Sequence, residues 1–337
     1  MAKILKATPE AIKDCKLALE HSQVIAVPTE TVYGLAANAL DVTAVEKIFA
    51  AKQRPFFDPL ILHTNSIDKA QTFCDFNPLA DQLAKYFWPG ALTLILKKKA
   101  IVPNIVTANL DSVAVRYPKH PIFQRLLEEL PFPLAAPSAN PFGYISPTSA
   151  EHVEASLGNH IEIILDGSNS TIGIESTIVD ARNPEKPKIL RPGPITQEML
   201  EDQIKLKFDA NPTQKNTAEI NELRGPGMLK SHYSPKTSLE LSPQANLERL
   251  ARGEIESGVA LLFLKKPAFL QTLPESVQKD IFWLSEDGLD LHIAQNLYRQ
   301  MRIIDAKAYK RILVETLPNE NGLNSALIDR LTKAAHQ

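Results

Sequence analysis

Short apolar runs alternate with amphipathic stretches along most of this 337-residue chain, and several of the runs stop at a proline. A run of four to eight apolar residues is typical of a buried strand, whereas apolar residues three or four positions apart are typical of a helix. The alternation therefore predicts an α/β fold in which helices pack against a sheet. The 25 prolines also predict stiff turns at strand ends, where binding residues commonly lie.

The first 204 residues are predicted to form one α/β domain. Thr8 and Pro9 have the pattern of a helix start, because threonine can accept a backbone hydrogen bond there and proline fits the first helical position. The predicted strands are 24–27, 60–63, 92–96, 113–116, 134–136, 162–165 and 176–179, and the predicted helices are 9–20, 44–52, 67–74, 78–87, 121–130 and 149–157.

The remaining residues are predicted to form a linker and a second domain. Residues 205–235 are polar, contain prolines and glycines and show no clear period, so we interpret them as an interdomain linker. Residues 236–337 show a shorter alternation, which predicts a small α/β domain. Its predicted strands are 259–264, 281–284 and 312–316, its predicted helices are 244–252, 289–304 and 324–335, and His292, Arg299 and Arg302 are interpreted as solvated helix-surface residues.

Composition and charge disfavour several classes of protein. The formal net charge of −2 lacks the basic excess of proteins that hold nucleic acid, so no stable nucleic-acid binding is expected. The two cysteines, Cys15 and Cys74, indicate reduced thiols in a cytoplasmic protein rather than a disulfide framework or a zinc site. No stretch approaches the roughly 18–20 apolar residues of a membrane span, so no membrane contact is expected.

The glycine-rich loops that commonly bind phosphate are missing from the sequence, which has neither G-x-x-x-x-G-K-[ST] nor G-x-G-x-x-G after a strand. Side-chain cations would then have to bind a nucleotide. Lys52 and Arg54, in the segment Lys52-Gln53-Arg54-Pro55, offer a point charge and a planar fork for phosphate oxygens. The alternative is that both cations only complement the C-terminus of the helix that ends there.

Small polar residues follow the strand predicted at 134–136. Ser138 and Asn140 could donate to a phosphate or a ribose from this strand end. The alternative is turn chemistry followed by a helix N-cap, for which Ser146 and Thr148 are candidates.

Further cations stand near polar loops at strand ends. The loop 28–34 follows a predicted strand and is a suitable place for substrate contacts. Arg116 and Arg191 end predicted strands beside small polar residues. Together with Lys52 and Arg54 they predict a shared cationic pocket, and the alternative is four separate solvated charges.

A series of segments in a fixed order resembles the YrdC-like domain of L-threonylcarbamoyl-AMP synthases over residues 8–200. The segments are PTETVYGL, KQRP-x-x-x-PLILH, FWPGALTLIL, SVAVRYP, PLAAPSAN, SPTSAEHV, LDG, ESTIVD and ILRPG. The later GPGMLKSHYSP, residues 225–235, followed by a small domain, resembles the long two-domain form of that family.

The resemblance implies a twisted, mixed sheet with flanking helices and a small Rossmann-like C-terminal domain. It also implies an enzyme that forms L-threonylcarbamoyladenylate and pyrophosphate from L-threonine, bicarbonate and ATP, with Mg²⁺ on the triphosphate. The adenylate would pass to proteins that modify the adenosine beside the anticodon of certain tRNAs. Residues 225–235 would close over the product and keep water from its mixed anhydride.

The resemblance also assigns residues by position, without a metal ligand from the protein. The signature and catalytic positions are Lys52, Arg54, Ser138 and Asn140; the L-threonine positions are Thr31, His63, Arg116, Ala136 and Ser176; and the ATP positions are Arg54, Asp58, Ser112, Ser138, Ser146, Arg191 and Tyr233. Asp58 departs from the family pattern, because many relatives have asparagine there, and a nucleotide contact at Asp58 would meet like charge unless water or a metal ion intervenes.

Two alternative functions remain open. A YrdC-like domain can present a concave basic face, which would suit an RNA-binding module, although the near-neutral charge disfavours this. The second alternative is a carbamoyl-adenylate former that acts on another acceptor. ATP turnover separates the enzymes from the binding module, and a requirement for threonine separates the two enzymes.

Overall fold

The computed structural model describes residues 1–209, 232–253 and 255–336. Two compact units divide the chain: an N-terminal unit of Met1–Phe142, Pro147–Thr171 and Glu175–Met228, and a C-terminal unit of Gly143–Ser146, Ile172–Ile174 and Leu229–Gln337. Most of the linker predicted at 205–235, including the proposed lid up to residue 231, lies outside the described residues. Within those residues, no helix has the length and apolar character needed to cross a membrane.

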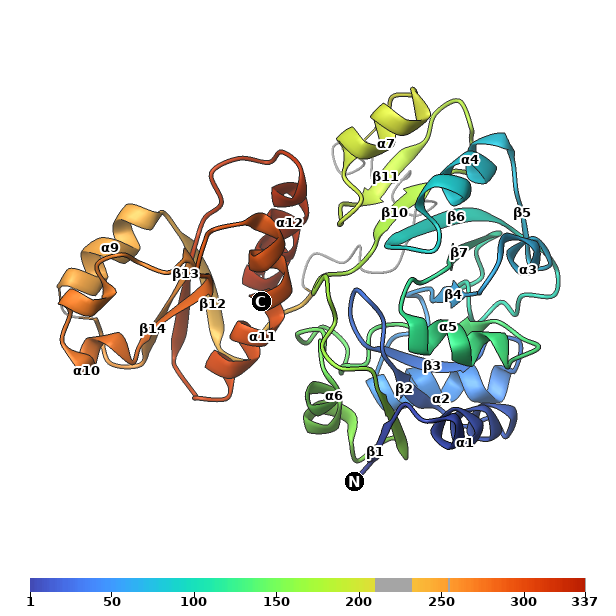
Figure 1. Ribbon diagram of the computed structural model, residues 1–337, viewed down its shortest axis with the longest axis horizontal. Coiled ribbons are helices and arrows are strands. Elements are labelled where there is room, and N and C mark those ends of the chain that lie inside the picture. The colour runs from blue at the N-terminus through green and yellow to red at the C-terminus, as the bar shows by residue number, and fades with distance from the viewer. Residues whose placement is uncertain (210–231, 254, 337) are drawn as a thin grey trace. The chain divides into compact units, whose positions relative to one another are not determined.

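The N-terminal unit is built on one mixed sheet (Figure 1). Its strands run in the order β1-β9-β2-β3-β8-β4-β7-β6-β10-β11, with β5 paired to β6, and the sheet contains both parallel and antiparallel pairs. The strands are β1 Lys3–Lys6, β2 Ile25–Val27, β3 Gly34–Asn38, β4 Ile61–His63, β5 Cys74–Asp75, β6 Leu92–Lys98, β7 Ser112–Arg116, β8 Leu134–Ala135, β9 Ile163–Asp166, β10 Thr177–Asp180 and β11 Lys188–Arg191. The mixed sheet implied by the resemblance is confirmed.

Except for α5 (Pro121–Glu128), the helices of this unit begin at a residue whose side chain caps them. The helices are α1 Pro9–Glu20, α2 Val42–Lys52, α3 Ile67–Gln71, α4 Pro78–Phe87, α5 Pro121–Glu128, α6 Ala150–Leu157 and α7 Gln197–Ile204. Thr8 caps α1 as predicted, by accepting from the N–H of Ala11 at 3.2 Å. The N-cap of α6 is Ser149, which accepts from the N–H of His152 at 3.3 Å, so the prediction of Ser146 or Thr148 as the cap was wrong.

The predicted C-terminal end of the helix at 67–74 was also wrong. Helix α3 stops at Gln71, and Cys74 instead pairs with Lys98 as part of β5. Phe73 and Cys74 are buried in the main core, where the short strand β5 pairs with the end of β6.

The two faces of the sheet carry different clusters of apolar side chains. The main core lies on one face and contains alternate strand residues such as Leu94 and Val115, packed with residues of α2, α4 and α6. Residues of α1 and α5 pack on the other face over β2, β3 and β9. Farther along that sheet is a separate cluster whose members all come from strands: Ile61, Ile95, Ala114, Ile178 and Leu190.

The C-terminal unit is a four-stranded sheet in which every strand pair is parallel. Its order is β12-β15-β13-β14, and its elements are β12 Ser238–Ser242, α9 Gln244–Arg252, β13 Val259–Lys265, α10 Glu275–Gln278, β14 Ile281–Ser285, α11 Asp290–Asp305, β15 Arg311–Glu315 and α12 Leu323–Ala335. A 3₁₀ turn at Leu270–Thr272 precedes α10. The small α/β domain expected from the sequence is confirmed.

Helix α11 binds a loop that comes from much earlier in the chain. Arg302 is buried, and its guanidinium donates to the carbonyl oxygens of Ile145 and Ser146 and lies 5.0 Å from the ring centre of Tyr144. Asp305 accepts from the hydroxyl of Tyr144 at 2.7 Å. The interpretation of Arg302 as a solvated surface charge was therefore wrong, because its partners are 156 or more residues away in sequence.

Candidate functional site

Lys52 ends helix α2 and binds the loop that follows β8. Its Nζ donates to the carbonyl oxygens of Ser138 and Asn140, at 2.5 Å each, and its own carbonyl accepts from the N–H of Phe142 at 2.8 Å. Burial lowers the pKa of Lys52 well below its ordinary value, and the nearby Arg54 charge lowers it further. The ammonium therefore joins three predicted signature positions, rather than only complementing the end of its own helix.

Arg54 and Asp58 form a buried ion pair just beyond that helix. Arg54 Nη2 lies 2.9 Å from Asp58 Oδ2, and the guanidinium also donates to the carbonyl oxygens of Asp58 and Pro59. Burial raises the pKa of Asp58 despite the opposing charges of Arg54, Lys52 and Arg191. The Asp58 carboxyl thus lies within the field of three cations that the sequence predicted to share a pocket.

Arg116 is held in place by three acceptors. At the end of β7, its Nε donates to the Gly90 carbonyl at 3.1 Å, its Nη1 to Thr31 Oγ1 at 2.9 Å, and its Nη2 to Glu30 Oε1 at 2.6 Å. A guanidinium has five N–H groups. Two of them therefore have no acceptor among the described residues and could bind an anion.

His63 is a buried neutral imidazole beside Arg116. The two residues are register partners on the parallel strands β4 and β7, and the His63 ring packs 5.5 Å from that of Phe123. Burial, followed by the Arg116 charge, lowers the pKa of His63 to about 3. The side chain can offer a hydrogen bond at neutral pH without adding a charge.

Ser176 and Arg191 meet where β10 begins and β11 ends. Arg191 Nε donates to the Ser176 carbonyl at 3.0 Å and its Nη2 donates to Ser176 Oγ at 3.1 Å. Ser176 Oγ lies 2.7 Å from Thr93 Oγ1, and Thr93 is the register partner of Arg116 on β6. A Cβ at Gly193 would lie 2.4 Å from the Thr177 nitrogen, so the loop after Arg191 needs glycine to approach Ser176 this closely.

His63, Ser112 and Arg116 share one sheet face with the separate strand cluster. Side chains alternate along a strand, so Ser112 and Arg116 project to the same side of β7 as Ala114. Ala136 follows β8, and its N–H donates to the Ile61 carbonyl at 3.0 Å. The result is an apolar floor bordered by cations and hydroxyl groups, which is the composition of a small-molecule site.

Two predicted ATP residues belong to the C-terminal unit. Ser146 is buried and its carbonyl accepts from Arg302 Nε at 3.3 Å. Tyr233 is buried with a φ of 64°, its ring stacks at 5.8 Å from that of Tyr298, and the Arg330 guanidinium lies 5.1 Å from its centre. Their contacts within that unit are established, whereas their part in an ATP site stays a prediction.

Sequence reasoning missed Glu30 and Thr93. Glu30 stands inside the quoted segment PTETVYGL but was treated only as part of a polar loop. Its signal was a lone carboxylate between two threonines in a loop that follows a predicted strand. Thr93 gave no signal of its own, because a threonine in an apolar strand is ordinary.

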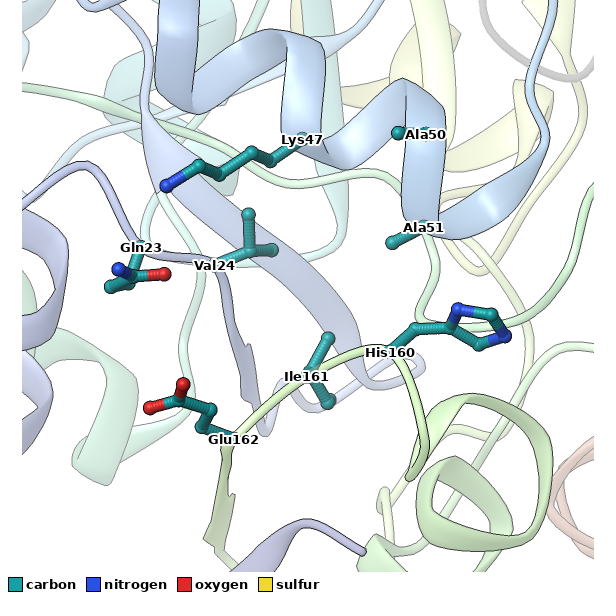
Figure 2. Close-up of a pocket in the computed structure, with 8 residues that line it drawn as sticks. All are labelled: Gln23, Val24, Lys47, Ala50, Ala51, His160, Ile161 and Glu162. Atoms are coloured by element: carbon teal, nitrogen blue, oxygen red, sulfur yellow. The ribbon is translucent and has the colours of Figure 1, made fainter.

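A separate pocket of about 320 Å³ lies elsewhere in the N-terminal unit (Figure 2). Its walls are Val24, Ala50, Ala51 and Ile161, and its polar rim is Gln23, Lys47, His160 and Glu162. None of these residues belongs to the predicted site, and Lys47 is engaged with the Ser22 carbonyl at 2.8 Å. Pocket size therefore does not identify the chemistry of this unit.

The site supplies cations rather than metal ligands. Across the described ranges of the chain, no group of three or more His, Cys, Asp or Glu residues could hold a metal ion. Mg²⁺ commonly binds through substrate phosphates with few protein carboxylates. The Asp58 carboxyl is already paired with Arg54, so the donor set fits a metal carried by a triphosphate better than one held by the protein.

Comparisons with known proteins cover both units. Residues 17–193 match the family model described as "Telomere recombination", and residues 195–336 match "Threonylcarbamoyl-AMP synthase, C-terminal domain". Threonylcarbamoyl-AMP synthase of Pyrococcus abyssi is 39% identical over 94% of this chain and 92% of its own length. The enzyme of that name from Bacillus subtilis is 37% identical over 98% of this chain and 94% of its own length.

A solved structure of a relative has the same fold. The crystal structure of Pyrococcus abyssi Sua5 complexed with L-threonine aligns with a TM-score of 0.86 and 36% identity, over 99% of this chain and 97% of that one. Both family models, both relatives and this structure agree. The chain therefore belongs to the threonylcarbamoyl-AMP synthase family, in its two-domain form.

Proposed function

We propose that this chain converts L-threonine, bicarbonate and ATP into L-threonylcarbamoyl-AMP and pyrophosphate. The observation that carries the proposal is the buried arrangement of Arg116, whose fork is fixed by three acceptors and still has two N–H groups to offer. It lies on the sheet face of the N-terminal unit that also carries Ser112 and the apolar cluster. Family membership supplies the reaction.

The amino acid is proposed to bind at Arg116. Its carboxylate would take the two remaining guanidinium N–H groups, since arginine matches a carboxylate in geometry. Thr31 Oγ1 accepts from Arg116 Nη1 and lies 2.8 Å from Thr29 Oγ1. Its hydroxyl group is therefore held beside the Arg116 guanidinium. The neutral His63, the backbone of Ala136 and the Ser176 hydroxyl complete the proposed threonine contacts.

The nucleotide is proposed to bind the other cations. Arg54 and Arg191 would meet the phosphates, while Lys52 holds the Ser138–Asn140 loop in the shape that presents its polar groups. Ser112 and the residues Ser146 and Tyr233 of the C-terminal unit are the further proposed ATP contacts, while Asp58 lies at the remaining ATP position with its carboxylate paired to Arg54. Mg²⁺ bound to the triphosphate would neutralise charge that develops on the leaving pyrophosphate.

The proposed chemistry has two steps that need no covalent intermediate with the protein. The amino nitrogen of threonine forms a bond to the carbon of bicarbonate. A carbon–oxygen bond of bicarbonate breaks and water leaves, which gives a carbamate. A carbamate oxygen then attacks the α-phosphorus of ATP, the bond to the β-phosphate oxygen breaks, and pyrophosphate leaves. The protein contributes orientation of two anionic reactants and fixed positive charge near the transferring phosphorus.

The location of the enzyme, the proteins that receive its product and the lid over the site are also proposals. The enzyme is proposed to act in the cytoplasm and to pass the adenylate to tRNA-modifying proteins. Residues 225–231 of the proposed lid lie outside the described part of the chain, so the lid rests on the family resemblance.

Release of pyrophosphate from ATP tests the proposal directly. With purified protein and Mg²⁺, release should require both L-threonine and bicarbonate, and mass spectrometry should detect threonylcarbamoyl-AMP. Arg116→Ala and Arg54→Ala should abolish release, while Arg299→Ala, at an exposed position of α11, should not. Release that ignores threonine would indicate another acceptor, and folded protein without any release would overturn the proposal.

A further inference from the structure

Glu30 is a buried carboxylate with a side-chain partner on only one of its two oxygens. Its Oε1 accepts from Arg116 Nη2 at 2.6 Å, and the side chain is 8% exposed. Its Oε2 is buried and has no hydrogen-bond partner of normal geometry among the described residues. Against the effect of burial, Arg116 and the nearby backbone N–H groups of Glu30 and Lys119 lower the pKa of this carboxyl, so it is held as a carboxylate. A buried carboxylate oxygen is normally satisfied by a donor, because an unmet acceptor loses its hydration without compensation.

The unused groups of Glu30 and Arg116 are complementary in charge. Arg116 keeps two N–H donors, and Glu30 keeps one acceptor oxygen, although the two side chains are already bonded to each other. One cationic fork and one anionic oxygen side by side match the two charges on the head of an α-amino acid. Its carboxylate suits the first and its amino group suits the second.

We propose that Glu30 Oε2 accepts a hydrogen bond from the amino nitrogen of the bound amino acid, which makes Glu30 a substrate-binding and specificity residue. The inference rests on the proposed function. It extends that function by assigning the amino group, which no predicted site residue accounts for. The same oxygen can keep its hydrogen bond after carboxylation, because a carbamate nitrogen still carries one N–H.

The arrangement has a consequence for selectivity. A site built around an unmet buried acceptor rejects a ligand that lacks the matching donor, because the acceptor then stays unsatisfied. L-Threonine without its amino group is (R)-3-hydroxybutanoate, which keeps the carboxylate and the hydroxyl. Wild-type protein should therefore bind L-threonine at least about tenfold more tightly than (R)-3-hydroxybutanoate.

Ligand-observed NMR titration of both compounds, with wild-type protein and Glu30→Gln, tests the inference. The variant keeps a carbonyl oxygen for Arg116 but places an NH₂ donor where Oε2 was. L-Threonine should bind about tenfold or more weakly, whereas (R)-3-hydroxybutanoate should change by less than about twofold. Asp180→Asn is the matched control, since Asp180 is another buried carboxylate paired with an arginine, Arg182, and both affinities should persist.

The outcomes separate the inference from the function beneath it. Equal weakening of both ligands by Glu30→Gln would show that Glu30 acts only by holding Arg116, which overturns the inference. Equal affinities of the two ligands for wild-type protein would overturn it even if the variant fails to fold. If wild-type protein binds neither ligand, the proposed function falls, and the inference falls with it.

Discussion

The ammonium group of Lys52 lies 2.5 Å from the carbonyl oxygen of Ser138, although 86 residues separate the two in sequence. The same nitrogen binds the Asn140 carbonyl. One buried charge thus ties the end of helix α2 to the loop after β8. Two motifs that lie far apart in the sequence are therefore parts of one structure.

Removing the Lys52 charge should damage both the fold and the reaction. Lys52→Met keeps the length of the side chain but leaves two carbonyl oxygens without their donor, at a cost of about 1–3 kcal/mol each. The free energy of unfolding in urea should fall by that order, and pyrophosphate release should drop at least about 100-fold at a temperature where the variant stays folded. Lys47→Met, which removes a single bond to the Ser22 carbonyl, is the control and should keep its activity.

The fork of Arg116 should not be replaceable by lysine. Arg116→Lys keeps the positive charge but cannot bind Gly90, Thr31 and Glu30 in one plane while presenting further donors. The KM for L-threonine should rise about 10–100-fold, while the KM for ATP changes by less than about threefold. Steady-state kinetics with each substrate varied in turn gives both values. An equal rise in both constants would contradict the assignment of Arg116 to the amino acid.

His63 should make the folded state sensitive to acid. Its pKa is lowered to about 3 by burial and, second, by Arg116, against an ordinary value of 6.5. Between these values the unfolded chain binds a proton that the folded chain does not, so stability falls as the pH falls, by up to about 1.4 kcal/mol per pH unit. Urea unfolding of His63→Gln should show a flatter dependence between about pH 6 and pH 4. His160→Gln, at an exposed position, should leave the slope unchanged.

The same relationships show what the sequence could and could not predict. Apolar runs such as 24–27 and 259–264 predicted strands, because a continuous run of apolar residues indicates a buried strand by itself. Strand β1, Lys3–Lys6, has exposed lysines at both ends and exists through its pairing with β9, so no local pattern revealed it. Strand β3, Gly34–Asn38, consists mainly of small residues whose strand character comes from pairing with β2 and β8.

The sequence predicted the cations of the candidate site, but it did not predict the ion pairs that these cations form. Motifs marked Arg54 and Arg116, because a resemblance transfers positions that bind ligands. It did not reveal that Asp58 pairs with Arg54 or that Glu30 pairs with Arg116, since ion pairs depend on distances that only the fold sets. Arg302 was misjudged for the same reason, because its partners come from a loop that sequence spacing could not place beside α11.

Arg302 should stabilise the C-terminal unit. Arg302→Ala removes the donor of the Ile145 and Ser146 carbonyls and the cation beside the Tyr144 ring. The free energy of unfolding should fall by about 2–4 kcal/mol. Arg299→Ala, three residues earlier on the same helix and exposed, should change it by less than about 0.5 kcal/mol. Similar losses in both variants would mean that the buried bonds of Arg302 contribute little.

Asp58 should weaken ATP binding at high pH and lose that effect in acid. Burial raises the pKa of its carboxyl, with Arg54, Lys52 and Arg191 opposing the shift, so the group takes up a proton at a higher pH than an ordinary aspartate. While ionised it repels the triphosphate and occupies Arg54, which lies 2.9 Å from Oδ2. Asp58→Asn should therefore bind ATP about 3–10-fold more tightly than wild-type protein near neutral pH.

The pH dependence of ATP binding distinguishes repulsion by the ionised Asp58 carboxylate from a structural effect of the substitution. As the pH falls through the raised pKa, wild-type Asp58 becomes neutral and its affinity for ATP should approach that of Asp58→Asn, whose own affinity lacks this step. Calorimetric titration with ATP across the pH range measures both curves, and Asp111→Asn, at an exposed carboxylate, should follow the wild-type curve. Weaker binding by Asp58→Asn at every pH would instead mean that the carboxylate orients Arg54 for the phosphates, so the ion pair would serve binding rather than oppose it.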